Sequence, residues 1–195
     1  MADILAKLTG ARSLSGWLHR CGAAVTVAVT LVAMPSAAAP AQEASEKALK
    51  VAFIYNFAKF TTWPDSAFGE PDAPVTVCVV GKHDFGDAFQ SIAGKSVGGR
   101  AVVIKYLNSY KSKDPCQVVY VAPSEKPRLA KIVDAAKEAH ALVVSDTDGF
   151  VDGGTTINMV PRNDRIGFEI NARVAGESGL KLSSKLLNLA ERVVN

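Results

Sequence analysis

The sequence predicts a single α/β domain with three layers, in which a mainly parallel sheet is flanked by helices and ends in a C-terminal β-hairpin and a closing helix. Between residues 75 and 144, continuous apolar runs typical of strands buried on both faces alternate with helical patterns. After residue 155 the pattern changes to two runs on either side of turn residues. Strands separated by helices imply right-handed crossovers and therefore parallel pairing.

Residues 1–41 have the pattern of a cleaved secretory signal peptide. A basic start is followed by the uncharged run CGAAVTVAVTLVAM and by small residues, with cleavage expected after Ala41. A retained membrane anchor is the alternative, but a spanning helix needs roughly 18–20 apolar residues and this run has about 14. We therefore expect one mature, exported domain at residues 42–195.

The charge of the predicted mature domain is close to neutral. The chain holds 22 Lys and Arg residues and 19 Asp and Glu residues. Three of the basic residues and one of the acidic residues lie in residues 1–41, so cleavage lowers the formal net charge from +3 to +1. A near-neutral chain without a basic run lacks the charge pattern of a nucleic-acid-binding protein, so we expect no nucleic-acid partner.

The first element of the mature domain is predicted to be a helix over residues 45–64. Ser45 is a candidate cap, and Pro64 prevents the helix from continuing. One face carries a stripe at spacings of four, four and three residues, namely Leu49, Phe53, Phe57 and Phe60. Lys50 and Lys59 leave only eight uncharged residues between them, which excludes a membrane span. The stripe indicates packing on a sheet, with a ligand pocket as the alternative.

The centre of the chain is predicted to alternate between strands and helices. Strands are expected at residues 75–80, 100–107, 116–121 and 141–144, and helices at residues 85–92 and 125–139. In the second of these helices the residues expected to face inward are Leu129, Ile132, Val133 and Ala136.

The last third is predicted to form the hairpin and the closing helix. Strands at residues 155–160 and 165–171 flank the turn residues 161–164. In the second strand Ile166, Phe168 and Ile170 alternate with polar residues and glycine, which places one face in the core. The closing helix is expected to carry one apolar face, made of Leu182, Leu186, Leu189 and Val193.

Two of the three cysteines remain after cleavage. Cys21 leaves with the signal peptide, and Cys78 and Cys116 form a candidate disulfide in an oxidising compartment. Two buried free thiols are the alternative. No CxxC pair or neighbouring His cluster supplies further ligands, so the sequence predicts no metal site at these cysteines.

The sequence carries no motif that supports catalysis or a cofactor. Gly94-Lys95-Ser96 resembles the end of a phosphate-binding loop, but Phe89 stands where the first glycine is required. His83 and His140 lack the partners of a catalytic triad. Aspartates 146, 148 and 152 are spaced like weak calcium ligands without the register of an EF-hand loop, which favours a polar turn. We expect a protein that is not an enzyme.

Six segments, taken in order, resemble one known family: KALKVAFIYNFAKFTTWP, VTVCVVGKHDFG, CQVVYVAPSE, LVVSDTDGFVDGGTTINMV, RIGFEIN and GLKLSSKLLNLA. Over residues 47–194 the chain is similar to the YfiR family of exported regulators. The resemblance implies a periplasmic, non-enzymatic repressor that binds the periplasmic sensor domain of an inner-membrane diguanylate cyclase and lowers cyclic-di-GMP signalling, hence biofilm formation. It also implies release by an OmpA-like outer-membrane lipoprotein, and it allows a homodimer.

The resemblance extends to individual residues. Cys78 and Cys116 match the family's cysteines in the first strand and in the C-x-V segment, which implies a disulfide. Some members carry a second cysteine pair linked to redox control, which this chain lacks. Phe168, Glu169 and Asn171 match a family signature. On an alternating strand Glu169 and Asn171 share the face opposite Phe168 and could contact a partner; a solvated or helix-covered face is the alternative.

Two further functions stay open at this point. One is a small-ligand sensing module in which the aromatic helix lines a pocket, and the other is an exported hydrolase. A ligand screen by thermal shift separates the first from the regulator, because a bound ligand must stabilise the fold.

Overall fold

The computed structural model describes residues 39–163 and 165–195. The predicted signal peptide therefore lies almost wholly outside the described residues and stays a prediction. The longer helices are α1 (Ala39–Lys59) and α2 (Leu129–Glu138), and the shorter ones are α3 (Ala172–Glu177) and α4 (Ser184–Leu189). Single 3₁₀ segments are η1 (Asp65–Ala67), η2 (Ala88–Ser91) and η3 (Pro123–Arg128).

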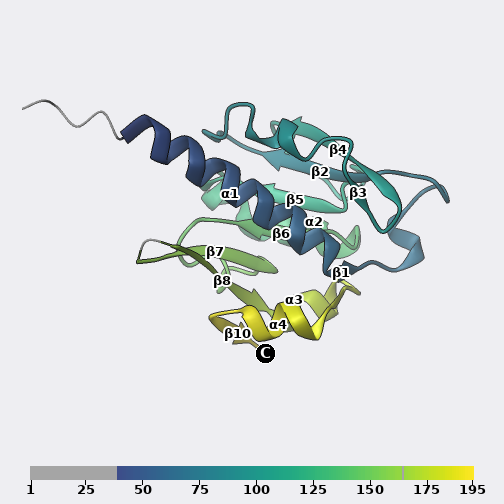
Figure 1. Cartoon of the computed structure of the whole chain (residues 1–195). Helices are drawn as coiled ribbons and strands as arrows, with labels where there is room; N and C mark the ends of the chain where they lie inside the picture. Colours follow the sequence, from purple (N-terminus) through teal and green to yellow (C-terminus); the bar gives the residue numbers. More distant parts are fainter. Residues whose placement is uncertain (1–38, 164) are drawn as a thin grey trace, which may run out of the picture. The chain divides into compact units, whose positions relative to one another are not determined.

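The strands of the described residues form two sheets (Figure 1). The main sheet contains β2 (Val75–Val80), β3 (Ser96–Val97), β4 (Arg100–Leu107), β5 (Val118–Val121), β6 (Leu142–Ser145), β7 (Ile157–Arg162), β8 (Arg165–Asn171) and β10 (Arg192–Val194). The small sheet pairs β1 (Thr61–Thr62) with β9 (Lys181–Leu182).

The main sheet is mixed and mostly parallel. Its eight strands follow the order β10-β8-β7-β6-β5-β2-β4-β3. Antiparallel pairing occurs in the β7–β8 hairpin and between β3 and β4, and the other neighbours are parallel. The α/β class with a mainly parallel sheet and a hairpin is thus confirmed.

The sheet buries a hydrophobic cluster on each face. Val77 and Val79 of β2 join the cluster that contains Ile54 and Phe57 of α1. Cys78 and Val80 alternate with them and join the second cluster, together with all four residues predicted to face inward from α2. Figure 1 shows α1 lying across the sheet. Successive residues of a strand point to opposite faces of the sheet, so the two long helices cover opposite faces.

The first helix lies closer to the N-terminus than predicted, and its apolar face is turned. It ends at Lys59 rather than at Pro64, so Phe60 lies outside it. It starts at Ala39, so Ser45 lies inside the helix and does not cap it. The preceding alanines, Gln42 and Glu43 favour helix, which explains the earlier start. Leu49 is 45% exposed, and the buried stripe runs instead through Val51, Ile54 and Phe57. Within the described residues, no helix is both long and apolar enough to cross a bilayer.

Two other helix predictions are wrong in type or extent. Residues 85–92 form only the 3₁₀ turn η2, and residues 125–128 belong to η3, so that the α-helix begins at Leu129. The strands at residues 75–80, 100–107 and 165–171 are confirmed with their predicted ends. The other three are shifted by one or two residues, because the apolar pattern does not show where ladder pairing begins.

The closing helix is the clearest error. Ser183 caps α4 by accepting a hydrogen bond from the Leu186 N–H, and the helix ends after Leu189. Ala190 is extended, and Val193 then pairs with Ile170 as part of β10. The described chain therefore closes on a strand that adds in parallel to the hairpin, and Leu189 is 62% exposed.

Candidate functional site

The disulfide is the first predicted site that the structure contains. Cys78 of β2 and Cys116, two residues before β5, are bonded, with their Cα atoms 5.8 Å apart. Both cysteines are buried in the cluster on the α2 face. Because β2 and β5 are neighbouring parallel strands, the bond joins the middle of one strand to the entry of the next. The alternative of two free thiols is thus excluded.

Glu169, one of the two predicted partner-contacting residues, lies on β8 and is paired within the chain. Its carboxylate accepts from the Arg192 guanidinium at 2.9 Å and 3.1 Å. The same guanidinium donates to Asp152 at 2.9 Å and 3.1 Å. Glu169 therefore helps to fix the C-terminal strand β10 beside β8. Its role in partner binding stays a hypothesis.

Asn171, the other predicted contact residue, is 2% exposed. Its Oδ1 accepts from the Val174 N–H at 3.0 Å and caps α3, and its Nδ2 donates to the Val151 carbonyl at 3.1 Å. Phe168 and Ile170 join the cluster on the α1 face, so Asn171 does point to the opposite side as expected. The helix-covered alternative describes it best, and we assign it a structural role.

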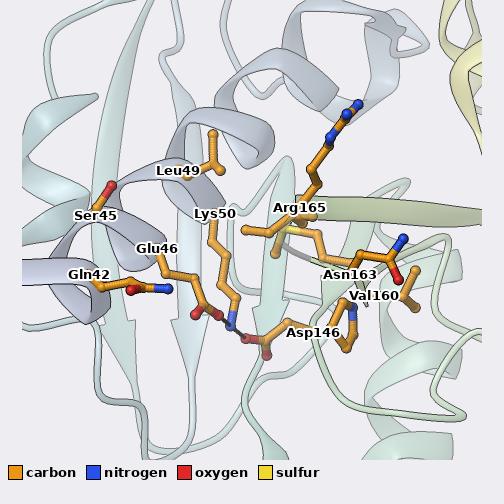
Figure 2. Close-up of a pocket in the computed structure, with 12 residues that line it drawn as sticks. Gln42, Ser45, Glu46, Leu49, Lys50, Asp146, Val160, Asn163 and Arg165 are labelled. Carbon is orange, nitrogen blue, oxygen red and sulfur yellow. Dashed lines mark ion pairs between the residues drawn. The ribbon is translucent and has the colours of Figure 1, made fainter. Parts of the chain in front are cut away.

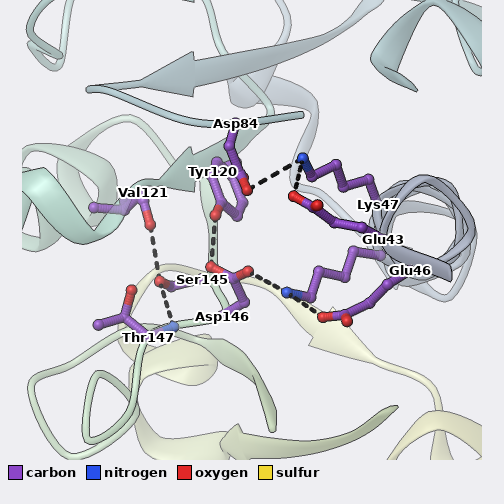
Figure 3. A network of polar contacts seen from close by, with 10 residues as sticks. Glu43, Glu46, Lys47, Asp84, Tyr120, Val121, Ser145, Asp146 and Thr147 are labelled. Atoms are coloured by element: carbon purple, nitrogen blue, oxygen red, sulfur yellow. Dashed lines mark hydrogen bonds and ion pairs between the residues drawn. The ribbon is translucent and has the colours of Figure 1, made fainter. Parts of the chain in front are cut away.

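The sequence did not reveal a polar network at the carboxyl end of the parallel strands (Figure 3). The Tyr120 hydroxyl on β5 donates to Asp146 Oδ1 at 2.6 Å. Lys50 of α1 lies 2.9 Å from Asp146 Oδ2 and 2.8 Å from Glu46 Oε1. Parallel strands bring their carboxyl ends to one edge, so Asp146, directly after β6, meets Tyr120 there. The network attaches α1 to the sheet.

Burial and hydrogen bonding together determine the protonation of two of these groups. Burial raises the pKa of the Tyr120 phenol far above its usual range, and the negative charge of Asp146 raises it further. Burial lowers the pKa of Lys50, but hydrogen bonds to Glu46 and Asp146 outweigh this and leave the Lys50 pKa raised. Tyr120 is thus a neutral donor and Lys50 a cation at neutral pH. With pKa values raised in this way, neither group is suited to act as a general base at neutral pH.

A second ion pair connects the N-terminal half of α1 to the loop that follows β2. Lys47 lies 2.8 Å from Glu43 and 3.4 Å from Asp84, which follows β2. Asp84 is largely exposed, so this contact is weak compared with the half-buried network of Lys50. Lys50, near the middle of α1, is therefore the stronger polar attachment of the helix.

A pocket of about 390 Å³ opens beside this network (Figure 2). It lies between α1, the residue after β6 and the β7–β8 hairpin. Apolar lining comes from Leu49, Met159 and Ile166, and charged lining includes Lys50, Asp146 and Arg165. Pockets that bind small molecules have this size and this mixture of apolar and polar groups.

The three aspartates considered as calcium ligands do not converge. Asp146 faces Lys50 and Tyr120, Asp152 faces Arg192, and Asp148 is exposed. Over residues 39–163 and 165–195 no group of three metal-ligating side chains is close enough to hold a metal ion. The segment is a turn, as the sequence favoured.

Comparison with known proteins gives a match to one family model and distant likenesses to solved structures. The family model described as YfiR/HmsC-like matches residues 47–191. A conserved domain protein from Vibrio cholerae O1 biovar El Tor is similar in structure, with a TM-score of 0.50 and 14% identity over 75% of this chain and 60% of that chain. At this identity the likeness shows the fold alone.

A second solved structure, the ABC domain in complex with L-Trp from Streptococcus pneumoniae, matches with a TM-score of 0.44 and 10% identity. That match covers 61% of this chain and 55% of the other. Against the curated proteins, no match was found. The chain spans about 60% of the length of the Vibrio cholerae protein.

Proposed function

The chain belongs to the YfiR/HmsC-like family, and from this premise we propose that it is an exported, non-enzymatic regulator. It binds the periplasmic sensor domain of an inner-membrane diguanylate cyclase and represses the enzyme, which lowers cyclic-di-GMP. The observation that carries the proposal is the family match over residues 47–191, which covers nearly all of the predicted mature domain.

The disulfide supports a periplasmic location. Disulfides persist in the bacterial periplasm and are rare in the cytosol. Here the bond joins the central strand β2 to the segment that enters β5, with Cys78 fully buried. Residues 1–41 would direct the chain there as a cleaved signal peptide. An OmpA-like outer-membrane lipoprotein would relieve the repression by competing for this protein.

The polar network supports a binding role over a catalytic one. Its titratable groups, Lys50, Tyr120 and Asp146, contact one another and attach α1. The pKa of Tyr120 and the pKa of Lys50 are both raised above their ordinary values, whereas a general base needs a pKa close to the working pH. The network therefore shapes a surface, and repression would follow from stoichiometric binding to the cyclase.

Deleting the gene should raise the cellular cyclic-di-GMP level several-fold, because the cyclase loses its repressor. The measurement is cyclic-di-GMP quantified by mass spectrometry in deletion and parent strains. Supplying the full chain from a plasmid should restore the parental level. Unchanged cyclic-di-GMP in the deletion strain would refute the proposal.

The pocket beside Lys50 favours small-ligand sensing as a second candidate function. A screen with amino acids and cell-wall fragments should then raise the melting temperature, since a ligand at 100 times its Kd stabilises by about 2.7 kcal/mol. Leu49→Asp, which changes the lining, should abolish the shift, and Leu189→Asp, at an exposed leucine of α4, should retain it. A screen without any shift removes this candidate.

A further inference from the structure

One edge of the main sheet is left open along most of β4. β3 pairs only with Arg100 and Ala101, at the start of this eight-residue strand. The contact ends at Val102, whose N–H donates to the Lys95 carbonyl at 2.8 Å and whose carbonyl accepts from the Gly94 N–H at 2.9 Å. On its inner side β4 pairs with β2 as far as Leu107. Figure 1 shows β4 and β3 at the edge away from β10.

The alternation of a strand identifies the backbone groups that face outward. Val102 directs both its N–H and its carbonyl to the outer side, so Ile104 and Tyr106 do the same. Leu107 faces β2, where its carbonyl accepts from the Gly81 N–H at 3.2 Å. In the described part of the chain no strand pairs with the outer side at positions 104 and 106. Such an edge is a template for a further strand.

The side chains along this edge are apolar and accessible. Val103 is 37% exposed and Tyr106 is 47% exposed. Ile104 is partly buried against the cluster on the α1 face, which attaches the strand to the core. An added strand would therefore cover apolar surface on both faces as well as gain main-chain hydrogen bonds.

The segment that contains β3 and β4 carries a local excess of positive charge. Residues 88–113 contain five basic residues and no acidic residue, namely Lys95, Arg100, Lys105, Lys111 and Lys113. All four lysines are exposed, and Lys105 lies in the centre of the open edge. This excess contrasts with the near-neutral charge of the predicted mature domain and would attract an acidic partner.

We infer that the open edge of β4, residues 103–107, is the docking site for an acidic β-strand of the partner protein. The identity of that partner as the cyclase sensor domain rests on the proposed function. The bound strand would hydrogen-bond to Ile104 and Tyr106 and would place a carboxylate near Lys105.

A second copy of this chain fits the edge less well. The symmetric antiparallel register that uses both outward-facing residues pairs Ile104 with Tyr106 of the other copy, and it sets the two Lys105 side chains directly opposite each other. Like charges in that position are destabilising, and lysine at an edge is a common protection against self-association. The charge therefore selects an acidic strand.

Two substitutions test the edge in the deletion strain supplied with the full chain. Lys105→Glu reverses the central charge, and Tyr106→Pro removes an outward N–H, a position where sheets tolerate proline. Both should fail to restore low cyclic-di-GMP although the protein accumulates folded. Lys131→Glu, at an exposed lysine of α2, is the matched control and should restore it. Restoration by a folded Lys105→Glu protein would overturn the inference and leave repression itself standing.

A photo-reactive amino acid placed at position 106 of the exported chain gives an independent readout. Mass spectrometry should identify an adduct with an acidic strand of the cyclase sensor domain, and the same group at position 131 should give none. This readout remains informative if the deletion leaves cyclic-di-GMP unchanged. In that case, an adduct with an acidic strand of another identified protein would support the docking site on β4 and would refute the proposed function. An adduct with a second copy, or no adduct, overturns the inference.

Discussion

Replacing Cys78 and Cys116 together with alanine should lower the free energy of unfolding by about 4 kcal/mol. The bond closes a loop between residues 38 positions apart, and without it the unfolded chain regains the entropy of that loop. This is a large share of the roughly 5–15 kcal/mol that stabilises a typical domain. Denaturant-induced unfolding of the two proteins, followed by circular dichroism, measures the difference.

The control for this loss is the wild-type chain unfolded in the presence of a reductant. It should be destabilised by a similar amount, because the covalent link is what both conditions remove. A double variant as stable as the oxidised wild type would show that the bond contributes nothing to the fold.

Phe57→Ala should destabilise the domain by about 3–5 kcal/mol. The side chain is 1% exposed, and its ring lies 5.0 Å from that of Phe168 on β8 and 5.8 Å from that of Phe53. The cavity would thus open where α1 packs on the hairpin, among rings that cannot close it without moving the helix. Chemical denaturation gives the free energy of unfolding.

The matched control is Leu189→Ala, at a leucine that is 62% exposed. It should change the free energy of unfolding by no more than about 0.5 kcal/mol. Equal losses in the two variants would mean that the stripe of α1 is not part of the core.

The central strands could be predicted because their pattern does not depend on context. All six residues of Val75–Val80 are buried, and a continuous apolar run of that length fits a strand covered on both faces. The strand Arg165–Asn171 was predicted because Phe168 and Ile170 alternate with polar residues and glycine. A continuous short apolar run predicts the first strand, and a period-two alternation predicts the second.

The C-terminal elements could not be predicted because tertiary pairing overrides a helical spacing. Leu182, Leu186 and Val193 have helical spacing, yet Leu182 pairs with Thr61 in the small sheet and Val193 pairs with Ile170 in the main one. The hydrogen bonds that stabilise each of these strand pairs come from residues far away in the sequence. No local pattern contains that information.

The polar site was equally hidden. Tyr120 and Asp146 are 26 residues apart, and only the parallel order of β5 and β6 brings them together, while Lys50 arrives from α1. The one sequence signal was that Asp146 directly follows a buried strand. The open edge of β4 was invisible too, because a strand pattern does not show which of its sides is paired.

The proposed repression requires that the chain binds the cyclase outside the cytosol. Cyclic-di-GMP measured in the deletion strain, supplied either with the full chain or with residues 42–195 kept in the cytosol, tests it most directly. We expect that only the full chain restores the parental level. Equal restoration by the cytosolic form, or by neither form, would contradict it.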